Sequence, residues 1–349
     1  MTIRKGENEM KAVVYEKPRE FGVTEIGKPK IEDNQVLLKV ELCGICRTDM
    51  HIHNGEFISR FPLTPGHEFT GYVSEVGKNV EGFAVGDRVV ADNTVLCGEC
   101  EYCRRDMPLF CERFYSLGVN GPGGFAEYVA VNYDKVFHIS DSLTFEQAAF
   151  AEPVACAVHG MDVIDVSCGD DILVFGAGPT GIILTQLLKQ GGAGRVVVCA
   201  SSRKKLELIE KNGYAQTVLM DRGDYSLHTG ELIDMAPKGF DIVVDATGSP
   251  KVLEQCFNFV RPTGKIVIYG VCGNDERITI SPYRIFENEL KILGSFAQTH
   301  CFPRAVKFLE EGIVKVDDLV SSTYPLSEFS DALELMEKGK DILKIMIKP

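Results

Sequence analysis

The stretch Asp171-Ile172-Leu173-Val174-Phe175-Gly176-Ala177-Gly178-Pro179-Thr180-Gly181 decides the fold of this chain. Its first five residues have the apolar character of a buried strand, and a helical pattern runs from 180 to 190. The intervening Gly-x-Gly-x-x-Gly allows a tight turn, and the helix N-terminus offers free N–H groups to a pyrophosphate. The stretch therefore predicts a dinucleotide-binding loop formed by Gly176, Gly178, Pro179, Thr180 and Gly181. A plain strand–helix turn is the alternative interpretation.

Strands and helices alternate on the C-terminal side of this loop. Apolar strands are expected at 195–199, 240–245, 264–270 and 290–294, with a helix at 203–212. This alternation predicts an α/β fold with a doubly wound parallel sheet of the Rossmann type. Because strand ends face the ligand crevice in such sheets, Thr247, Gly270 and Val271 are expected beside the bound dinucleotide.

The end of the second strand, Cys199-Ala200-Ser201-Ser202-Arg203-Lys204-Lys205, contains no acidic residue. An acid at this position usually bonds the ribose 2′-hydroxyl of NAD. Ser201, Ser202 and Arg203 offer hydroxyls and a guanidinium fork instead, which suit a 2′-phosphate. We therefore predict NADP(H) as the cofactor, with NAD less favoured. Alternatively, the cations are only the solvated first turn of a helix.

Short strands separated by Gly and Pro turns dominate the first 150 residues and predict a barrel-like β domain. This part contains Cys97-x2-Cys100-x2-Cys103-x7-Cys111, within a lobe at 92–113. Four thiolates at this spacing can surround a structural zinc completely. An iron–sulfur cluster and a zinc-ribbon nucleic-acid module are the competing interpretations, and the motif lacks the usual fourth-Cys-Pro pattern of the former.

A second metal site is indicated by Pro65-Gly66-His67-Glu68, with Cys43 upstream and Glu152 downstream. One thiolate, one imidazole and one or two carboxylates can hold a catalytic zinc and leave a position open. We therefore expect Cys43, His67, Glu68 and Glu152 at a catalytic zinc, giving two zinc ions per subunit.

Composition narrows the class of protein. The 349 residues are 45% hydrophobic and 25% charged, and 50 acidic against 37 basic residues give a net charge of −13. This balance disfavours nucleic-acid or anionic-membrane partners, which require basic surfaces. The charged start, Met1 to Glu9, lacks the apolar region of a secretory signal, and no segment suits a membrane span. We expect an extension at residues 1–9 without regular structure and a cytoplasmic protein with metal-binding cysteines.

These motifs together resemble the zinc-containing medium-chain alcohol dehydrogenase family. Gly66-His67-Glu68-x2-Gly71-x5-Gly77-x2-Val80 is similar to its zinc signature, and Cys43-Gly44-Ile45-Cys46-Arg47-Thr48-Asp49-Met50-His51 to its first-ligand loop. Asn54-Gly55-Glu56-Phe57 and Glu152-Pro153-Val154-Ala155-Cys156 resemble the polyol branch, which includes the sorbitol and arabinitol dehydrogenases.

The resemblance implies a GroES-like catalytic domain at 1–154, a Rossmann domain at 155–296 and a return to the catalytic domain at 297–349. It also implies homodimers or homotetramers that join nucleotide-domain sheets through the strand near Leu290–Leu293. In this family Glu152 would lie beside the zinc, bound directly or through water.

Further roles follow from the chemistry and the resemblance together. Thr48 and His51 would relay the substrate proton, and Arg47 would contact the pyrophosphate. An ordinary surface histidine is the alternative interpretation of His51. Asp49 is either a partner that orients His67 or a cap of its own loop.

The resulting functional hypothesis is an oxidoreductase, a zinc- and NADP(H)-dependent polyol dehydrogenase that interconverts a polyol and a ketose. One alternative keeps the same machinery for a sugar-phosphate alcohol, threonine or another secondary alcohol. The other is a non-catalytic, NADP-binding redox sensor.

Overall fold

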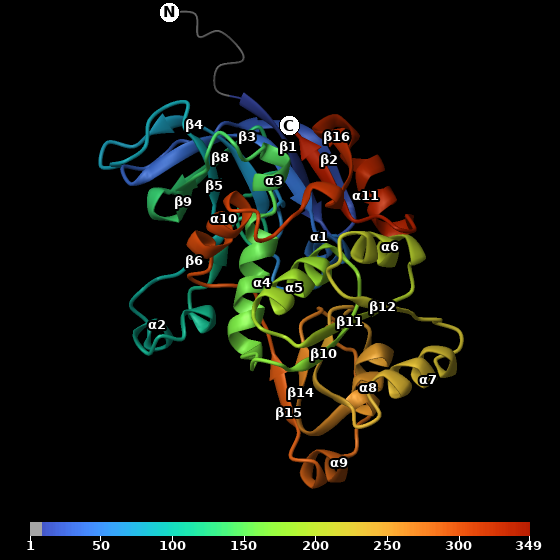
Figure 1. Ribbon diagram of the computed structural model, residues 1–349. Coiled ribbons are helices and arrows are strands. Elements are labelled where there is room, and N and C mark those ends of the chain that lie inside the picture. Colours follow the sequence, from blue (N-terminus) through green and yellow to red (C-terminus); the bar gives the residue numbers. More distant parts are fainter. Residues whose placement is uncertain (1–8) are drawn as a thin grey trace, which may run out of the picture. The chain divides into compact units, whose positions relative to one another are not determined.

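The structure is a computed structural model that describes residues 9–349, so most of the extension expected at 1–9 lies outside the described residues. The chain divides into two compact units (Figure 1). The first unit runs to Glu152 and also contains Phe302–Gly312 and Val316–Pro349. The second contains Pro153–Cys301 and Ile313–Lys315. Across residues 9–349, no helix combines the length and apolar character needed to cross a membrane.

The first unit is built around a seven-stranded sheet with the order β16-β17-β3-β4-β5-β9, in which β8 also pairs with β3. Two smaller sheets join β1 to β2 and β6 to β7. The elements of this unit are β1 (Glu9–Lys17), β2 (Glu20–Gly27), β3 (Gln35–Ile45), α1 (Arg47–Asn54), β4 (Glu68–Val76), β5 (Arg88–Ala91), β6 (Thr94–Val95), α2 (Glu101–Arg104), β7 (Tyr115–Ser116), β8 (Tyr128–Asn132), β9 (Val136–His138), α3 (Phe145–Ala148), α10 (Phe302–Glu310), β16 (Val320–Pro325), α11 (Phe329–Lys338) and β17 (Lys344–Lys348).

The C-terminal strand completes this sheet from the far end of the sequence. Ile345 and Ile347 of β17 lie opposite Ile45 and Cys43 of β3 in an antiparallel pair. Figure 1 shows β16 and α11, at the red end of the colour scale, beside the blue N-terminal strands. The apolar face of α11 packs on the same core, where Phe329 contacts Phe125 and Phe21. Residues far apart in the sequence therefore share one hydrophobic core.

The second unit contains a six-stranded sheet with the order β12-β11-β10-β13-β14-β15, and every pair in it is parallel. The central strands β10, β11 and β13 are buried apolar runs because helices cover a parallel sheet. The predicted Rossmann fold is confirmed. Its elements are β10 (Asp171–Phe175), α5 (Pro179–Gln190), β11 (Arg195–Ala200), α6 (Arg203–Lys211), β12 (Gln216–Leu219), α7 (Ser226–Met235), β13 (Phe240–Asp245), α8 (Pro250–Phe259), β14 (Val260–Ile268), α9 (Pro282–Glu287) and β15 (Lys291–Gly294), and α4 (Ala151–Ile164) leads into it.

Several elements were absent from the sequence-based prediction. β12 has only four residues, and α9 has only six. α7 carries Gly230 in its middle and has little amphipathic pattern, so the helical period is weak there. Short or weakly patterned elements form because the neighbouring strands and helices supply their contacts.

Candidate zinc and dinucleotide sites

Cys46, His67 and Glu68 bring their ligand atoms within 4.8 Å of one another, which is a geometry suited to a metal ion. Cys46 is the residue before α1, where the chain leaves strand β3. His67 and Glu68 stand at the start of β4, which pairs with β3 so that Gly44 lies opposite Glu68. Gly66, with φ +99°, makes the turn before them, and a Cβ there would approach the Phe125 backbone nitrogen to 2.7 Å. Sheet pairing therefore assembles the cluster.

Cys43 does not belong to this cluster, so the prediction that it supplies the thiolate requires correction. Its side chain is fully buried in the hydrophobic core with Ile45 and Phe69. Burial also raises the pKa of the Cys43 thiol well above its usual range. Side chains alternate along β3, so Cys43 faces the side opposite to Gly44, which is the residue paired with Glu68. Cys46 follows the strand, its sulfur lies in the cluster, and it is the cysteine placed to bind a metal.

Glu68 has a partner that sequence reasoning missed. The ammonium of Lys344 lies 2.7 Å and 2.5 Å from the two carboxylate oxygens of Glu68, and both side chains are almost completely buried. Lys344 also donates to the carbonyl of Ile45. Burial pushes the pKa of Lys344 down, but the charges of Glu68, Cys46 and Glu152 outweigh burial, and the net shift is upward. No local motif marks Lys344, because it lies 276 residues from Glu68.

Glu152 and Asp49 lie around the cluster rather than within its 4.8 Å group. Glu152 is in the first turn of α4, close enough for its charge to act on Lys344. Asp49 is buried, accepts a hydrogen bond from the Cys46 N–H at 2.8 Å and lies 3.7 Å from Nδ1 of His67. Asp49 thus caps its helix, and its other oxygen faces the imidazole without a hydrogen bond, so the role of orienting His67 stays a prediction.

The predicted relay residues lie on one helix, α1, instead of on a loop. The Thr48 hydroxyl is 3.8 Å from Sγ of Cys46, and His51 follows one turn later on the same side of the helix. Nδ1 of His51 lies 2.5 Å from Oε2 of Glu56. Arg47, at the start of α1, is exposed.

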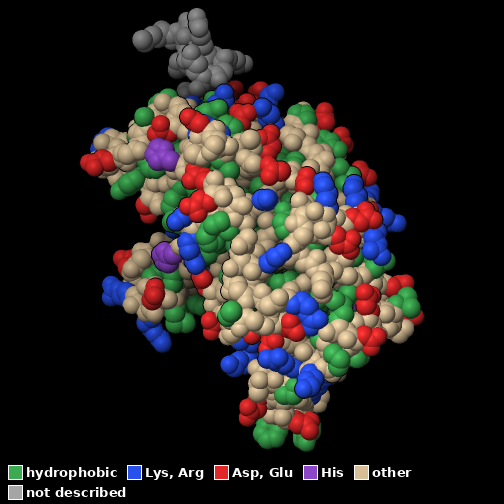
Figure 2. All heavy atoms as spheres, in the orientation of Figure 1, with side chains coloured by type: hydrophobic (Ala, Val, Ile, Leu, Met, Phe, Trp, Pro, Cys, Tyr) green, Lys and Arg blue, Asp and Glu red, His purple; other side chains and the backbone are tan. Residues whose placement is uncertain are grey.

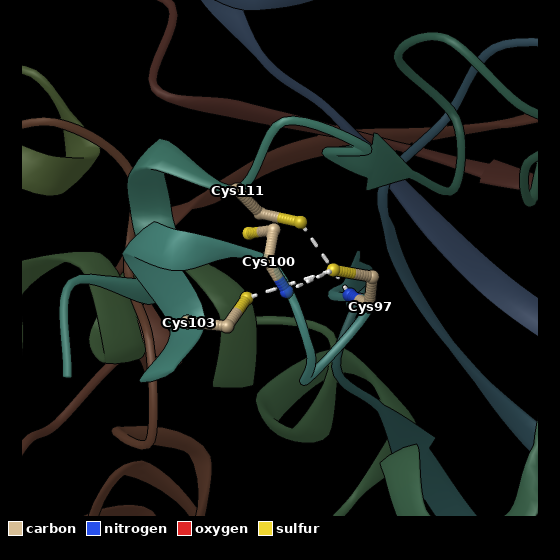
Figure 3. Close-up of side chains that lie close together, drawn as sticks. All are labelled: Cys97, Cys100, Cys103 and Cys111. Atoms are coloured by element: carbon tan, nitrogen blue, oxygen red, sulfur yellow. Dashed lines mark hydrogen bonds between the residues drawn. The ribbon is translucent and has the colours of Figure 1, made fainter. Parts of the chain in front are cut away.

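The four cysteines of the lobe converge as the sequence predicts. Figure 3 shows the sulfur atoms of Cys97, Cys100, Cys103 and Cys111 facing a common centre, and all four lie within 4.8 Å of one another. Backbone N–H groups of Glu99 and Cys100 lower the pKa of Cys97 to about 6, whereas burial raises the pKa of Cys103 to about 12. Four adjacent thiols cannot all ionise unless a cation balances their charge, and a tetrahedral zinc supplies that balance.

The glycine loop lies close to the loop after β13, which in turn lies close to the loop after β14. A Cβ on Gly176 would lie 3.0 Å from the carbonyl oxygen of Ala246, and one on Gly270 would lie 2.2 Å from the nitrogen of Gly248. Thr247 donates from its N–H and hydroxyl to Oδ1 of the buried Asp245, which holds the second loop. Strands β10, β13 and β14 are adjacent, so the loops at their carboxyl ends lie side by side. These loops contain Gly176–Gly181, Thr247 and Gly270–Val271. The glycine loop leads into the N-terminus of α5, whose free backbone N–H groups suit a pyrophosphate.

Ser201, Ser202 and Arg203 lie at the end of β11 and the start of α6. Ser202 is the N-cap of α6, and its hydroxyl accepts a hydrogen bond from the Lys205 N–H at 3.2 Å. Ser201 and Arg203 are exposed. The first helical turn thus presents one exposed hydroxyl and one exposed guanidinium, while the second hydroxyl is used in the cap.

Known families match both units of the chain. Residues 32–141 match the alcohol dehydrogenase GroES-like domain, and residues 179–311 match the zinc-binding dehydrogenase domain. D-arabinitol dehydrogenase 1 of Uromyces fabae is 46% identical over 98% of this chain and 97% of that protein. The chain belongs to the zinc-containing medium-chain dehydrogenase family, in its polyol dehydrogenase branch. The predicted family and the GroES-like-plus-Rossmann fold are confirmed.

Other relatives of this dehydrogenase span its full length. Sorbitol dehydrogenase of Bacillus subtilis is 32% identical over 97% of both chains. A zinc-binding dehydrogenase from Sinorhizobium meliloti 1021, solved with NADP, superposes with a TM-score of 0.91 at 32% identity over 98% of this chain and 100% of that chain. An alcohol dehydrogenase of E. coli CFT073 complexed with NADH gives 0.89 at 29% identity over 98% and 100%. Neighbours with NADP and with NADH leave the preference of this chain open.

The donor atoms fit the zinc ions that the family implies. Cys46, His67 and Glu68 supply sulfur, nitrogen and oxygen, the ligand types of open catalytic zinc sites. The His67 Nδ1 and Asp49 Oδ1 atoms are buried without a hydrogen-bond partner in the described part of the chain. Because these two atoms face each other at 3.7 Å, Asp49 is the residue that would orient the His67 ring when its other nitrogen binds a metal.

Proposed function

We propose that this dehydrogenase interconverts a polyol and a ketose with zinc and NADP(H). The observation that carries the proposal is the carboxylate-containing cluster of Cys46, His67 and Glu68, beside the buried Lys344 and Glu152. Oxygen ligands make a harder metal site than a set of thiolates, which suits a substrate with adjacent hydroxyls. D-arabinitol dehydrogenase 1, at 46% identity, supports the same substrate class.

The roles proposed for the residues follow from their positions. Cys46, His67 and Glu68 would hold the zinc, with Glu152 acting on it directly or through water. Zinc, when bound, supplies Lewis acidity that makes the substrate hydroxyl easier to deprotonate. Thr48 and His51 would accept the released proton in turn, and Arg47 would contact the dinucleotide pyrophosphate. Cys97, Cys100, Cys103 and Cys111 would hold the second, structural zinc.

The proposed preference for NADP(H) is supported by the absence of an acid after β11. Exposed Ser201 and Arg203 are suited to a 2′-phosphate, whereas a carboxylate there would repel it. Replacing Ser201 by Asp is expected to raise KM for NADP by at least tenfold and to change KM for NAD little. Equal or better kcat/KM with NAD in the wild type would overturn this preference.

The substrate class is tested with a panel of pentitols, hexitols, threonine, a polyol phosphate and a simple secondary alcohol, each with NAD and NADP. We expect the highest kcat/KM with a pentitol or hexitol. D-arabitol-phosphate dehydrogenase of Enterococcus avium is 32% identical over 97% of this chain, so a phosphorylated polyol is the second candidate. A wild type that turns over no member of the panel would instead favour the non-catalytic redox sensor.

The corrected thiolate assignment has its own matched pair of variants. Cys46→Ser is expected to remove turnover and about one zinc per subunit. Cys43→Ala is expected to keep its zinc and to lose only packing stability, since it lies in the core. The opposite pattern would restore Cys43 as the ligand.

We also propose that the chain forms homodimers or homotetramers through β15, the outermost strand at one edge of the parallel sheet. Tyr283 and Phe286 of α9 are 66% and 79% exposed, and Ile292 of β15 is 41% exposed. Figure 2 shows exposed hydrophobic side chains where Figure 1 places α9. An exposed, apolar sheet edge favours pairing with another chain.

A further inference from the structure

The imidazole of His51 contacts the carboxylate of Glu56, a residue to which the sequence analysis assigned no role. The Nδ1 atom of His51 lies 2.5 Å from Oε2 of Glu56. The His51 side chain is 17% exposed and that of Glu56 is 40% exposed, so the imidazole is largely enclosed while the carboxylate reaches solvent. An ionised carboxylate can only accept hydrogen bonds, so it fixes the proton of the neutral imidazole on Nδ1.

The end of helix α1 places this carboxylate beside the ring. Gly55 takes a left-handed conformation with φ +80°, which a side chain would disfavour. The Gly55 N–H donates to the carbonyl of Ile52 at 3.0 Å, and the Glu56 N–H donates to the carbonyl of His51 at 2.9 Å. This pair of bonds is a Schellman motif, which reverses the chain after a helix. Backbone and side chain of Glu56 are thus both bonded to His51.

We infer that Glu56 is a positioning residue for proton transfer: it holds His51 with Nε2 free to accept the proton that the substrate hydroxyl releases. The inference rests on the proposed dehydrogenase function and on the relay through Thr48 and His51. In alcohol oxidation, a bound nicotinamide would supply the hydride acceptor, and Thr48 would pass the hydroxyl proton to Nε2 of His51. The imidazolium that forms is stabilised by the Glu56 carboxylate, and it then gives the Nε2 proton to water, so Glu56 itself gains no proton.

Thr48, His51 and Glu56 follow one another in space, starting from the metal cluster. Sγ of Cys46 is 3.8 Å from the Thr48 hydroxyl, and His51 lies three residues further along α1, where side chains are neighbours. Glu56 then extends the series to the surface. In a Ser-His-Asp triad, a histidine base likewise lies between a hydroxyl and a carboxylate that orients the ring.

The test compares Glu56→Gln, His51→Asn and the double variant in the zinc-loaded enzyme. The substrate is whichever alcohol of the panel gives the highest kcat/KM, so the relay remains testable when the substrate is not a polyol. Single-turnover rates of cofactor reduction isolate the chemical step from product release. Glu56→Gln is expected to slow this step by roughly tenfold to hundredfold, less than the 10²–10⁴ that a general base contributes. KM for the alcohol, Kd for the cofactor and zinc content are expected to stay unchanged.

The double variant distinguishes a relay from a purely structural contact. In the His51→Asn background, Glu56→Gln is expected to have no further effect on the rate, because Glu56 acts only through the imidazole. Glu75→Gln is the matched control, since Glu75 forms a 2.8 Å ion pair with Lys28 on the surface of the same unit. Wild-type rates in Glu56→Gln, or a slowing that persists in His51→Asn, would overturn the inference. Loss of zinc or of cofactor affinity in Glu56→Gln would also overturn the inference, because it would show that Glu56 maintains the folded structure of the site.

Discussion

At the scale of single residues, Lys344 is the most unusual side chain of the zinc-binding unit. It is 3% exposed, carries a charge and sits on a strand whose other inner residues are apolar. A buried ion pair contributes little compared with an apolar pair, but removing one partner leaves an uncompensated charge in the core. Lys344 is therefore needed to balance the charge of the buried Glu68 carboxylate.

Replacing Lys344 by Met is expected to lower the free energy of unfolding by about 3–5 kcal/mol, because Glu68 then stays buried without a counter-charge. Urea denaturation of the zinc-depleted protein measures the loss, because a zinc ion bound by Glu68 would itself supply a counter-charge. Lys348→Met is the control on the same strand, since its ion pair with Glu41 is 58% exposed on the lysine side. The control is expected to lose at most about 1 kcal/mol. Equal losses in the two variants would mean that burial of the Glu68 pair does not matter.

His228 is a second buried polar residue, on α7 of the nucleotide-binding unit. It is 1% exposed, and both of its ring nitrogens lack a hydrogen-bond partner among residues 9–349. Burial lowers the pKa of His228, and the charges of Asp221 and Asp224 oppose the shift without cancelling it. The folded protein therefore holds the neutral ring.

The sign of the resulting pH dependence follows from this lowered pKa. The unfolded state takes up the proton first, so the stability from His228 is present above about pH 6.5, the ordinary histidine pKa. It is lost as the pH falls from there through the lower folded value. Between pH 7 and pH 5, the wild type is expected to lose more stability than His228→Phe. Parallel curves of unfolding free energy against pH would contradict this expectation.

At the scale of elements, the lobe that carries α2 is held by its cysteines and not by a core. None of the residues of α2 is buried, and Tyr102, Met107 and Phe110 of the lobe are partly exposed. A segment with so little buried apolar area depends on a bound metal for its structure.

Replacing Cys103 by Ser is expected to reduce zinc from about two to about one per subunit and to open the lobe. Metal analysis measures the first effect, and trypsin cleavage after the exposed Arg104 and Arg105 measures the second. Cys168→Ser, an exposed cysteine of the other unit, is the control. An unchanged zinc content in Cys103→Ser would contradict the prediction that the four cysteines bind a zinc ion.

At the scale of the whole molecule, the exposed sheet edge predicts the state of assembly. A charge on an edge strand opposes pairing with another chain. Ile292→Asp is therefore expected to shift the protein from a dimer or tetramer to a smaller species, as measured by sedimentation equilibrium. Ile233→Asp introduces the same charge at a 47% exposed isoleucine on α7 of the same unit and should leave the mass unchanged. A wild type with the mass of one chain would refute the proposed assembly.

The sequence by itself determined the features whose chemistry is local. Gly176–Gly181 lies within one turn between a strand and a helix, and Cys97–Cys111 spans one short lobe, so spacing alone predicts what these residues can bind. The family signature around His67 and five of the six parallel strands were predictable for the same reason, because strong apolar runs alternate with helical periods. The four-residue strand β12 has no such run and was not predicted.

Tertiary structure decided the features that depend on which side of a strand a residue faces and on what lies across the sheet. Cys43 and Cys46 are three residues apart and chemically equal in sequence. Strand alternation turns Cys43 into the core, whereas Cys46, at the end of the strand, lies beside His67 and Glu68. Lys344 meets Glu68 only because β17 pairs with β3 across the length of the chain. Pairing across a sheet brings distant residues within hydrogen-bond distance, and the register of that pairing cannot be predicted from the spacing of residues along the chain.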